Sequence, residues 1–141
     1  MPASDDEIAF APVTELSRWI ESRQLSSERL TQIYLGRIER LDGKIRSVIT
    51  TTRDHALARA KAADAEIAAG KYRGPLHGIP YGVKDLLDTK DIPTTYGAEP
   101  FRNRVPAAIS ASAARARRRA WSFVSVMTDR IFPSSRAIRS R

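Results

Sequence analysis

A lysine inside an apolar run is the residue that most readily suggests chemistry. Lys84 follows Val83 and stands two residues before Leu86 and three before Leu87. Lysine is seldom buried, and burial without a carboxylate partner lowers the pKa of an amine from about 10.4 toward neutrality. A neutral amine can act as a general base, whereas a lysine at the end of a strand reaches solvent with its stem packed. Spacing alone leaves both interpretations open.

Glycine and proline punctuate the segment directly before this lysine. They stand at Gly74, Pro75, Gly78, Pro80 and Gly82. Such a density of these residues breaks helices and restricts the backbone to tight turns. We therefore expect a rigid turn that leads into a buried strand over residues 81–87. A polar loop should follow over residues 89–97.

Patterns upstream predict the elements that must hold this strand. Apolar residues recur at helical spacing over residues 14–22 and about 26–42, with Ser26 or Ser27 as the cap of the second helix. Residues 46–52 are rich in β-branched side chains and predict a short strand. A third helix over residues 52–70 has a mostly alanine inward face and should pack closely. The order of elements predicts an α/β fold.

The sequence around the lysine resembles the N-terminal part of the amidase signature family. The matching string runs Gly-Pro-Leu-His-Gly-Ile-Pro-Tyr-Gly-Val-Lys-Asp over residues 74–85, and Thr-Thr-Tyr-Gly follows over residues 94–97. The resemblance covers about residues 9–106. It implies N-terminal helices packed on the start of a mixed β-sheet, here as an incomplete fold of that type.

The resemblance also implies a reaction. Members of this family hydrolyse or transfer at amide C–N bonds of small-molecule substrates, with no metal and no cofactor. Their triad is a serine nucleophile, a second serine in a cis peptide and a lysine, and Lys84 corresponds to that lysine. A serine hydroxyl is a weak nucleophile until a base takes its proton, and a neutral lysine can do so through a bridging hydroxyl. Backbone N–H groups of a glycine-rich turn would stabilise the oxyanion.

Both serines of the triad belong to a Gly/Ser-rich run that follows the lysine in family members, and this chain has no such run. Its last glycine is Gly97, and the Ser134-Ser135 pair stands between Pro133 and Arg136. We interpret the chain as a truncated segment that keeps only Lys84 and is inactive alone. A subunit resembling the glutamine-dependent amidotransferases that act on charged transfer RNA shares the same lysine motif and is the alternative.

Charge divides the chain near residues 102–106. Residues 102–141 hold ten arginines against the single acid Asp129, although the whole chain has 24 basic and 16 acidic side chains. This change predicts an amidase-like part over residues 1–106 and a basic tail over residues 107–141, irregular or helical. A shift of reading frame near codon 106 would explain the arginine-only charge and the lost serine motif together.

A selected basic tail is the other explanation for residues 107–141. Arg115 and residues 117–119 form a cluster that could contact nucleic acid or an anionic membrane surface. A helix over residues 109–127 would place most of these arginines opposite an apolar side. No nucleic-acid-binding module precedes the cluster, so the sequence argues against a nucleic acid partner.

Composition bounds the remaining functions. The chain has no cysteine, and its two histidines stand 22 positions apart, which does not make a metal site. We expect His55 on a helix surface and His77 as a hydrogen-bonding residue of the rigid turn. No uncharged run approaches the roughly 20 residues of a membrane span. The acidic start lacks the pattern of a secretion signal, so a cytoplasmic location is expected.

Overall fold

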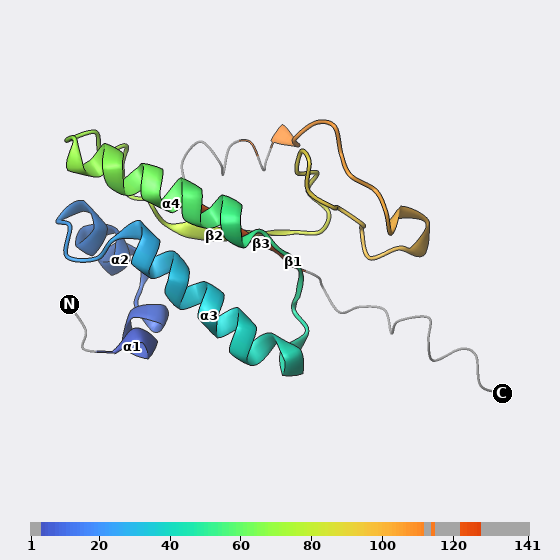
Figure 1. Ribbon diagram of the computed structural model, residues 1–141, viewed down its shortest axis with the longest axis horizontal. Helices are drawn as coiled ribbons and strands as arrows, with labels where there is room; N and C mark the ends of the chain where they lie inside the picture. The colour runs from blue at the N-terminus through green and yellow to red at the C-terminus, as the bar shows by residue number, and fades with distance from the viewer. Residues whose placement is uncertain (1–3, 112–113, 115–121, 128–141) are drawn as a thin grey trace.

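The computed structural model describes residues 4–111, 114 and 122–127. Its helices and strands follow one another in the order shown in Figure 1. They are α1 (Asp5–Phe10), α2 (Val13–Glu21), α3 (Ser27–Ile45), β1 (Val48–Thr51), α4 (Arg53–Ala68), β2 (Pro80–Lys84), the 3-10 helix η1 (Glu99–Phe101) and β3 (Ser122–Met127). The predicted α/β arrangement of helices and strands is confirmed.

The predicted helices exist, with differences at their ends. Ser26 is the cap of α3, because its hydroxyl accepts a hydrogen bond from the Arg29 N–H at 3.0 Å. Helix α3 continues to Ile45, three residues beyond the expected end, and stops where Arg46 adopts a left-handed conformation with φ 51°. Helix α1 is an addition, and Ser4 begins it through a capping box with Glu7.

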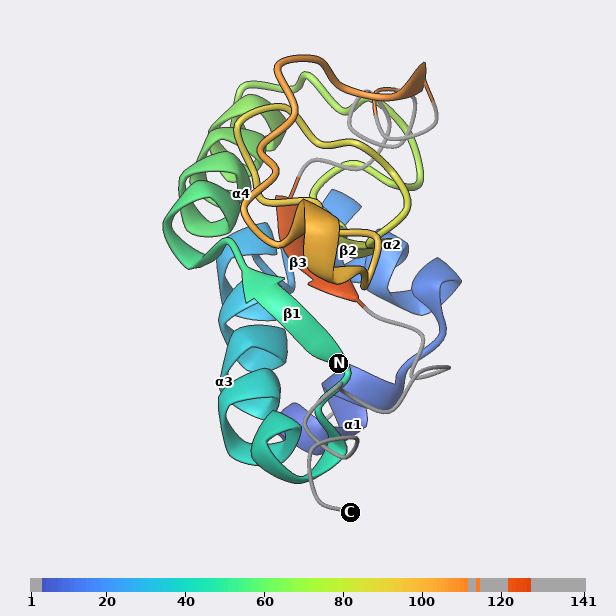
Figure 2. The ribbon, with the colours of Figure 1, turned by 90° about the vertical axis from the view of Figure 1, so that its right-hand side faces the viewer.

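Helices α3 and α4 pack against each other and lie together on one side of the sheet (Figure 2). The predicted alanine face of α4 is confirmed, because Ala56, Ala60 and Ala63 are fully buried. Leu35 of α3 packs against Ala56. Small side chains let the backbones of α3 and α4 approach closely. Helix α3 therefore buries residues on the side that faces α4, in addition to those on the side that faces α1 and α2.

The main core lies where α1, α2 and α3 meet the end of α4 and the turn before β2. The buried side chains that form it are Ile8, Leu16, Ile20, Leu25, Leu30, Ile33, Ile67 and Ile79. Burying an aliphatic side chain of this size contributes roughly 1.5–3 kcal/mol relative to leaving it exposed. The core therefore fixes residue 79, immediately before β2, to the helical layer.

The sheet has three strands in the order β1-β3-β2. Strand β3 runs antiparallel to β1 and parallel to β2, so the sheet is mixed. Strand β2 ends at Lys84, three residues short of the predicted end, because the chain turns at Asp85. The order also shows that the central strand is the last of the three in the sequence.

The expectation of an irregular or helical tail after residue 106 is wrong for residues 122–127. These residues form β3, between β1 and β2. The helical periodicity over residues 109–127 takes no account of β1 and β2. These two strands have open edges and offer backbone hydrogen-bonding partners that an isolated segment lacks. The arginine cluster at 115 and 117–119 and the Ser134-Ser135 pair lie outside the described residues.

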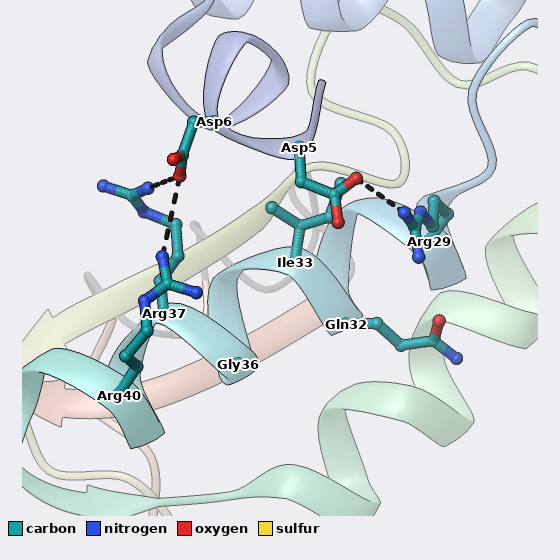
Figure 3. Close-up of a pocket in the computed structure, with 8 residues that line it drawn as sticks. All are labelled: Asp5, Asp6, Arg29, Gln32, Ile33, Gly36, Arg37 and Arg40. Atoms are coloured by element: carbon teal, nitrogen blue, oxygen red, sulfur yellow. Dashed lines mark hydrogen bonds and ion pairs between the residues drawn. The ribbon is translucent and has the colours of Figure 1, made fainter. Parts of the chain in front are cut away.

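Helix α1 is attached to α3 by charge as well as by the core. Figure 3 shows Asp5 paired with Arg29, and Asp6 paired with Arg37 and Arg40, around a small pocket. The pocket is lined by Asp5, Asp6, Arg29, Gln32, Ile33, Gly36, Arg37 and Arg40. Its arginines are engaged with α1, and neither helix carries Lys84.

Candidate functional site

The turn before β2 is fixed to the helices by one glycine. Gly78 has φ +81°, and its carbonyl accepts a hydrogen bond from the buried Ser27 hydroxyl at 2.6 Å. A Cβ at Gly78 would stand 3.0 Å from the Cβ of Ser27. Glycine is required here both for its positive φ and for the close approach of the turn to α3.

Helix α4 holds the other side of this junction. The Asp64 carboxylate accepts hydrogen bonds from the backbone N–H groups of Ser27 at 2.7 Å and Glu28 at 2.9 Å. A carboxylate at a helix N-terminus satisfies free donors and interacts favourably with the helix dipole. Ser27 therefore links α4, the start of α3 and the turn that leads into β2.

His77 holds the same turn from inside, as expected. Its side chain is completely buried, and its Nδ1 accepts a hydrogen bond from the Arg73 N–H at 3.2 Å. Its Nε2 lies 3.2 Å from a carboxylate oxygen of Glu66. Burial lowers the pKa of His77, and the Glu66 charge only partly opposes this effect. His55 is exposed on α4, as predicted.

Lys84 is the last residue of β2, and its side chain is exposed in the described structure. Of the two interpretations of Lys84 that spacing left open, the described structure shows a lysine at the end of a strand whose side chain reaches solvent, and not one buried inside an apolar strand. The neighbouring Val83 is buried, at 5% exposure, beside Tyr81, Leu87 and Ile92. Side chains alternate along an extended segment, so a lysine next to a buried valine points to the other face.

Asp85, which sequence analysis did not single out, is the buried carboxylate next to Lys84. It is 4% exposed, and one carboxylate oxygen accepts a hydrogen bond from the Thr95 N–H at 2.8 Å. The other oxygen accepts from the Thr95 hydroxyl at 2.6 Å and from the Gly97 N–H at 3.1 Å. Three donors from one loop thus converge on the residue after Lys84. The one signal of these contacts in the sequence is an aspartate inside an apolar run, because aspartate is seldom buried without partners.

The loop around Asp85 adopts an uncommon backbone. Tyr96 and Gly97 are both left-handed, with φ 55° and 66°. A non-glycine residue in this region costs about 1–2 kcal/mol. In this conformation the N–H groups of Thr95 and Gly97 both point to the Asp85 carboxylate.

A second carboxylate holds the outer side of this loop. Asp88 accepts hydrogen bonds from both terminal nitrogens of Arg104 at 2.6 Å and from the Tyr96 hydroxyl at 2.7 Å. The guanidinium of Arg104 also lies 4.6 Å from the centre of the Tyr96 ring. Hydrogen bonds from Arg104 and then from Tyr96 lower the pKa of Asp88 to about 2. This bidentate pair fixes the strained Tyr96 by its side chain.

Backbone hydrogen bonds fold residues 88–110 back on themselves (Figure 1). The N–H groups of Asp91, Thr94 and Ser110 donate to the carbonyls of Pro106, Arg104 and Asp88, respectively, at 2.8–3.1 Å. The segment after β2 is therefore an ordered loop tied at both ends. Thr94 is fully buried in this loop, and its hydroxyl donates a hydrogen bond to the Ile92 carbonyl at 3.2 Å.

The described residues contain neither a candidate metal site nor a candidate membrane-spanning helix. Within residues 4–111, 114 and 122–127, no group of three or more histidine or acidic side chains could hold a metal ion. No helix of that part of the chain is both long enough and apolar enough to cross a bilayer.

The sequence of this chain matches the model of a known protein family. The Amidase family model matches residues 29–125. The match includes the turn before β2, Lys84 and the loop that Asp85 and Asp88 hold. It continues 19 residues beyond the predicted limit of the resemblance at residue 106. It ends inside β3.

Relatives with curated names agree with this match. "Putative amidase AmiD" of Mycobacterium tuberculosis is 46% identical over 113 residues, which is 80% of this chain and 24% of that protein. A glutamyl-tRNA(Gln) amidotransferase subunit of Methylococcus capsulatus is 49% identical over 86 residues, 61% of this chain and 18% of that protein. The chain thus spans about a quarter or less of the length of these relatives.

Solved structures show the same backbone arrangement. The native peptide amidase from Stenotrophomonas maltophilia superposes with a TM-score of 0.80 at 31% identity. The similarity covers 88% of this chain and 26% of that enzyme. A family model that matches most of the chain, relatives at nearly half identity and a common fold lead to one conclusion: this chain belongs to the amidase signature family.

Proposed function

We propose that this chain is the lysine-bearing N-terminal part of an amidase-signature domain that acts on amide C–N bonds of small molecules. The observation that carries the proposal is the setting of Lys84. It ends a strand that a glycine turn fixes on one side and a carboxylate-held loop fixes on the other. Its side chain is exposed while Asp85 is buried, so the amine faces away from the clamp.

In the proposed reaction Lys84 is the general base. Its neutral amine takes a proton from a serine through a second, bridging serine hydroxyl, and the first serine oxygen attacks the amide carbonyl. The C–N bond breaks as the proton returns to the leaving amine, and water then hydrolyses the acyl ester. A lysine is neutral near pH 7 only where it is shielded from water. The rest of the domain must supply that shield and both serines.

Two further proposals concern what lies beyond the described site. We infer that the chain alone hydrolyses no amide, because its sequence after Gly97 lacks glycine altogether. We also retain the frameshift near codon 106, which the arginine-only charge and the lost serine run support. The family match to residue 125 counts against a shift as early as codon 106, since residues 107–125 still align with the family. Sequencing the locus and finding no Gly/Ser-rich run in another frame would reject it.

A chimera tests the role of Lys84. Residues 1–106 of this chain replace the matched segment of the Stenotrophomonas maltophilia peptide amidase, and hydrolysis of a peptide amide is measured. We expect an active chimera in which Lys84→Ala lowers kcat by about 10³-fold or more. Lys90→Ala, at an exposed position of the following loop, is the matched control and should retain the full rate.

The results separate the possibilities. An active chimera that tolerates Lys84→Ala would reject Lys84 as the base. A folded chimera without activity would reject the claim that this segment supports the family's chemistry.

Part of a glutamine-dependent transfer-RNA amidotransferase is the second candidate. The relative from Methylococcus capsulatus, which carries such a name, supports it. The motif around Lys84 is common to both, so the distinction lies in the substrate. A second chimera built on that relative, with the other chains of its complex present, should release ammonia from glutamine if this alternative holds. A cytoplasmic location and a binding role for the basic tail stay predictions.

A further inference from the structure

The geometry points to Asp85 as the positioning residue of the amide-cleaving site: its buried carboxylate fastens the loop of residues 94–97 to the end of β2 and so sets the direction of Lys84. This inference rests on the proposed function, because Lys84 is the group that is positioned. It adds a residue that contacts no substrate and acts through the backbone of its neighbour.

The contacts of Asp85 account for both of its oxygens. The backbone N–H and the hydroxyl of Thr95 each donate to a different oxygen, and the Gly97 N–H donates a third bond, at 2.6–3.1 Å. A carboxylate in a buried position requires such donors, since it is otherwise costly to remove from water. The loop is thus ordered around one charge.

The position of Asp85 in the chain converts this order into direction. It follows Lys84 with no residue between, at the point where the chain turns, and Asp85 is buried whereas Lys84 is exposed. Because Asp85 is held by three bonds, the peptide that joins it to Lys84 has little freedom to rotate. The amine is therefore confined to the face away from the clamp. Without the clamp, the strand end could turn and misdirect the amine, and small misplacements of a reacting group are costly in rate.

The second carboxylate of this region does a different task. Asp88 contacts side chains, those of Tyr96 and Arg104, and is three residues further from Lys84. Asp85 contacts two backbone N–H groups as well as the Thr95 hydroxyl, and it is adjacent to Lys84. Loss of Asp88 should loosen the outer loop and leave the strand end in place.

The test uses the full chain, labelled for NMR, and compares Asp85→Asn with Asp91→Asn. Both changes replace a carboxylate with an amide, but Asp91 is exposed in the same loop. Asparagine presents an NH₂ group where the carboxylate accepted hydrogen bonds, so donors would face a donor. We expect Asp85→Asn to speed hydrogen exchange of the Thr95 and Gly97 amides by about tenfold or more and to move the side-chain signals of Lys84. Asp91→Asn should change neither.

The inference is overturned if folded Asp85→Asn leaves both amides at the original exchange rates. It is also overturned if the loop loosens while the Lys84 signals stay in place, because Asp85 would then be only structural.

Should Asp85→Asn fail to fold, substitutions of Thr95 decide the question. Thr95→Val keeps the shape and removes the hydroxyl donor, whereas Thr95→Ser retains it. We expect valine to move the Lys84 signals and serine to leave them near their original positions. Equal signals in the two variants would overturn the inference. Because none of these measurements uses hydrolysis, an inactive chimera with an intact Asp85 clamp would reject the amidase role alone.

Discussion

The chain is held in two different ways before and after β2. Before the strand, the turn at residues 74–79 is held by the close packing of Gly78 on Ser27 and by the hydrogen bonds of Ser27 and the buried His77. After the strand, residues 85–106 are held by charge, through two carboxylates that collect donors. Both regions fix the same short strand, but they do so at opposite ends and by different physics.

The two kinds of contact predict which substitutions each region should tolerate. Steric fit to a close-packed core depends little on pH or salt, and it fails when volume is added. Carboxylate clamps respond to protonation and fail when a charge or an acceptor is removed. Lys84 therefore stands between a close-packed turn, in which only the buried His77 responds to pH, and a loop that is held by ionised carboxylates.

The largest effect is expected in the turn before β2. Gly78→Ala forces a strained φ and pushes a Cβ against Ser27, so the free energy of unfolding should fall by roughly 2–4 kcal/mol. Gly36→Ala is the control, because Gly36 lies in α3 with no atom within 4 Å of the added Cβ. Alanine there should stabilise the chain by up to about 1 kcal/mol. Denaturant unfolding measures both, and equal effects would contradict steric control of the turn.

The next effect is the pH dependence of His77. Burial lowers its pKa in the folded chain, so the unfolded chain binds more protons as the pH falls through the ordinary value of about 6.5. Stability is therefore full above that value and decreases below it. We expect Tm to fall between pH 7.5 and 5.5, and His77→Asn to flatten this slope. His55→Asn, at an exposed site, should keep it, and equal slopes in all three chains would refute the explanation.

The stability that the loop after β2 contributes should change at a lower pH. The pKa of Asp88 is held at about 2, so its contribution to stability is complete above about 4 and is lost as the pH falls toward 2. Asp88→Asn should lower Tm near pH 6, and its difference from the original chain should shrink as the pH approaches 2. Thermal unfolding across this range checks the prediction, and a constant difference would argue against it.

The smallest effect is expected from a neighbouring surface pair. Arg102 and Glu99 form an ion pair at 2.7 Å with both side chains well exposed. Solvent screening limits such pairs, so Arg102→Ala should change the free energy of unfolding by less than about 0.5 kcal/mol. If its effect on Tm near pH 6 matched that of Asp88→Asn, the special role given to the Asp88 clamp would be wrong.

Local patterns predicted much of the helical layer. The alanine face of α4 and the Ser26 cap follow from residue types within one turn, and both are confirmed. Leu35 of α3 packs against Ala56 of α4, a contact that the apolar periodicity of α3 alone does not reveal. The strand that carries Lys84 was predicted too long, since the aspartate that turns the chain takes its partners from ten residues away.

The tail shows the same limit more strongly. Residues 122–127 fit an amphipathic helix when considered alone, yet they form the central strand. A strand gains its hydrogen bonds from other strands, so its formation depends on partners that local sequence does not contain. The boundary predicted at residue 106 and the role of the arginine cluster stay predictions.

By itself, the order of residues determined the family, the place of Lys84 at a strand and the rigid turn before it, because these depend on short motifs and backbone preference. Tertiary structure alone decided that Asp85 holds the loop, that Gly78 touches Ser27 and that the lysine is exposed. The contacts of Asp85 and of Gly78 join residues that are 10 and 51 positions apart, respectively. Which donors reach a carboxylate, and which face meets water, are settled only when distant parts of the chain pack together.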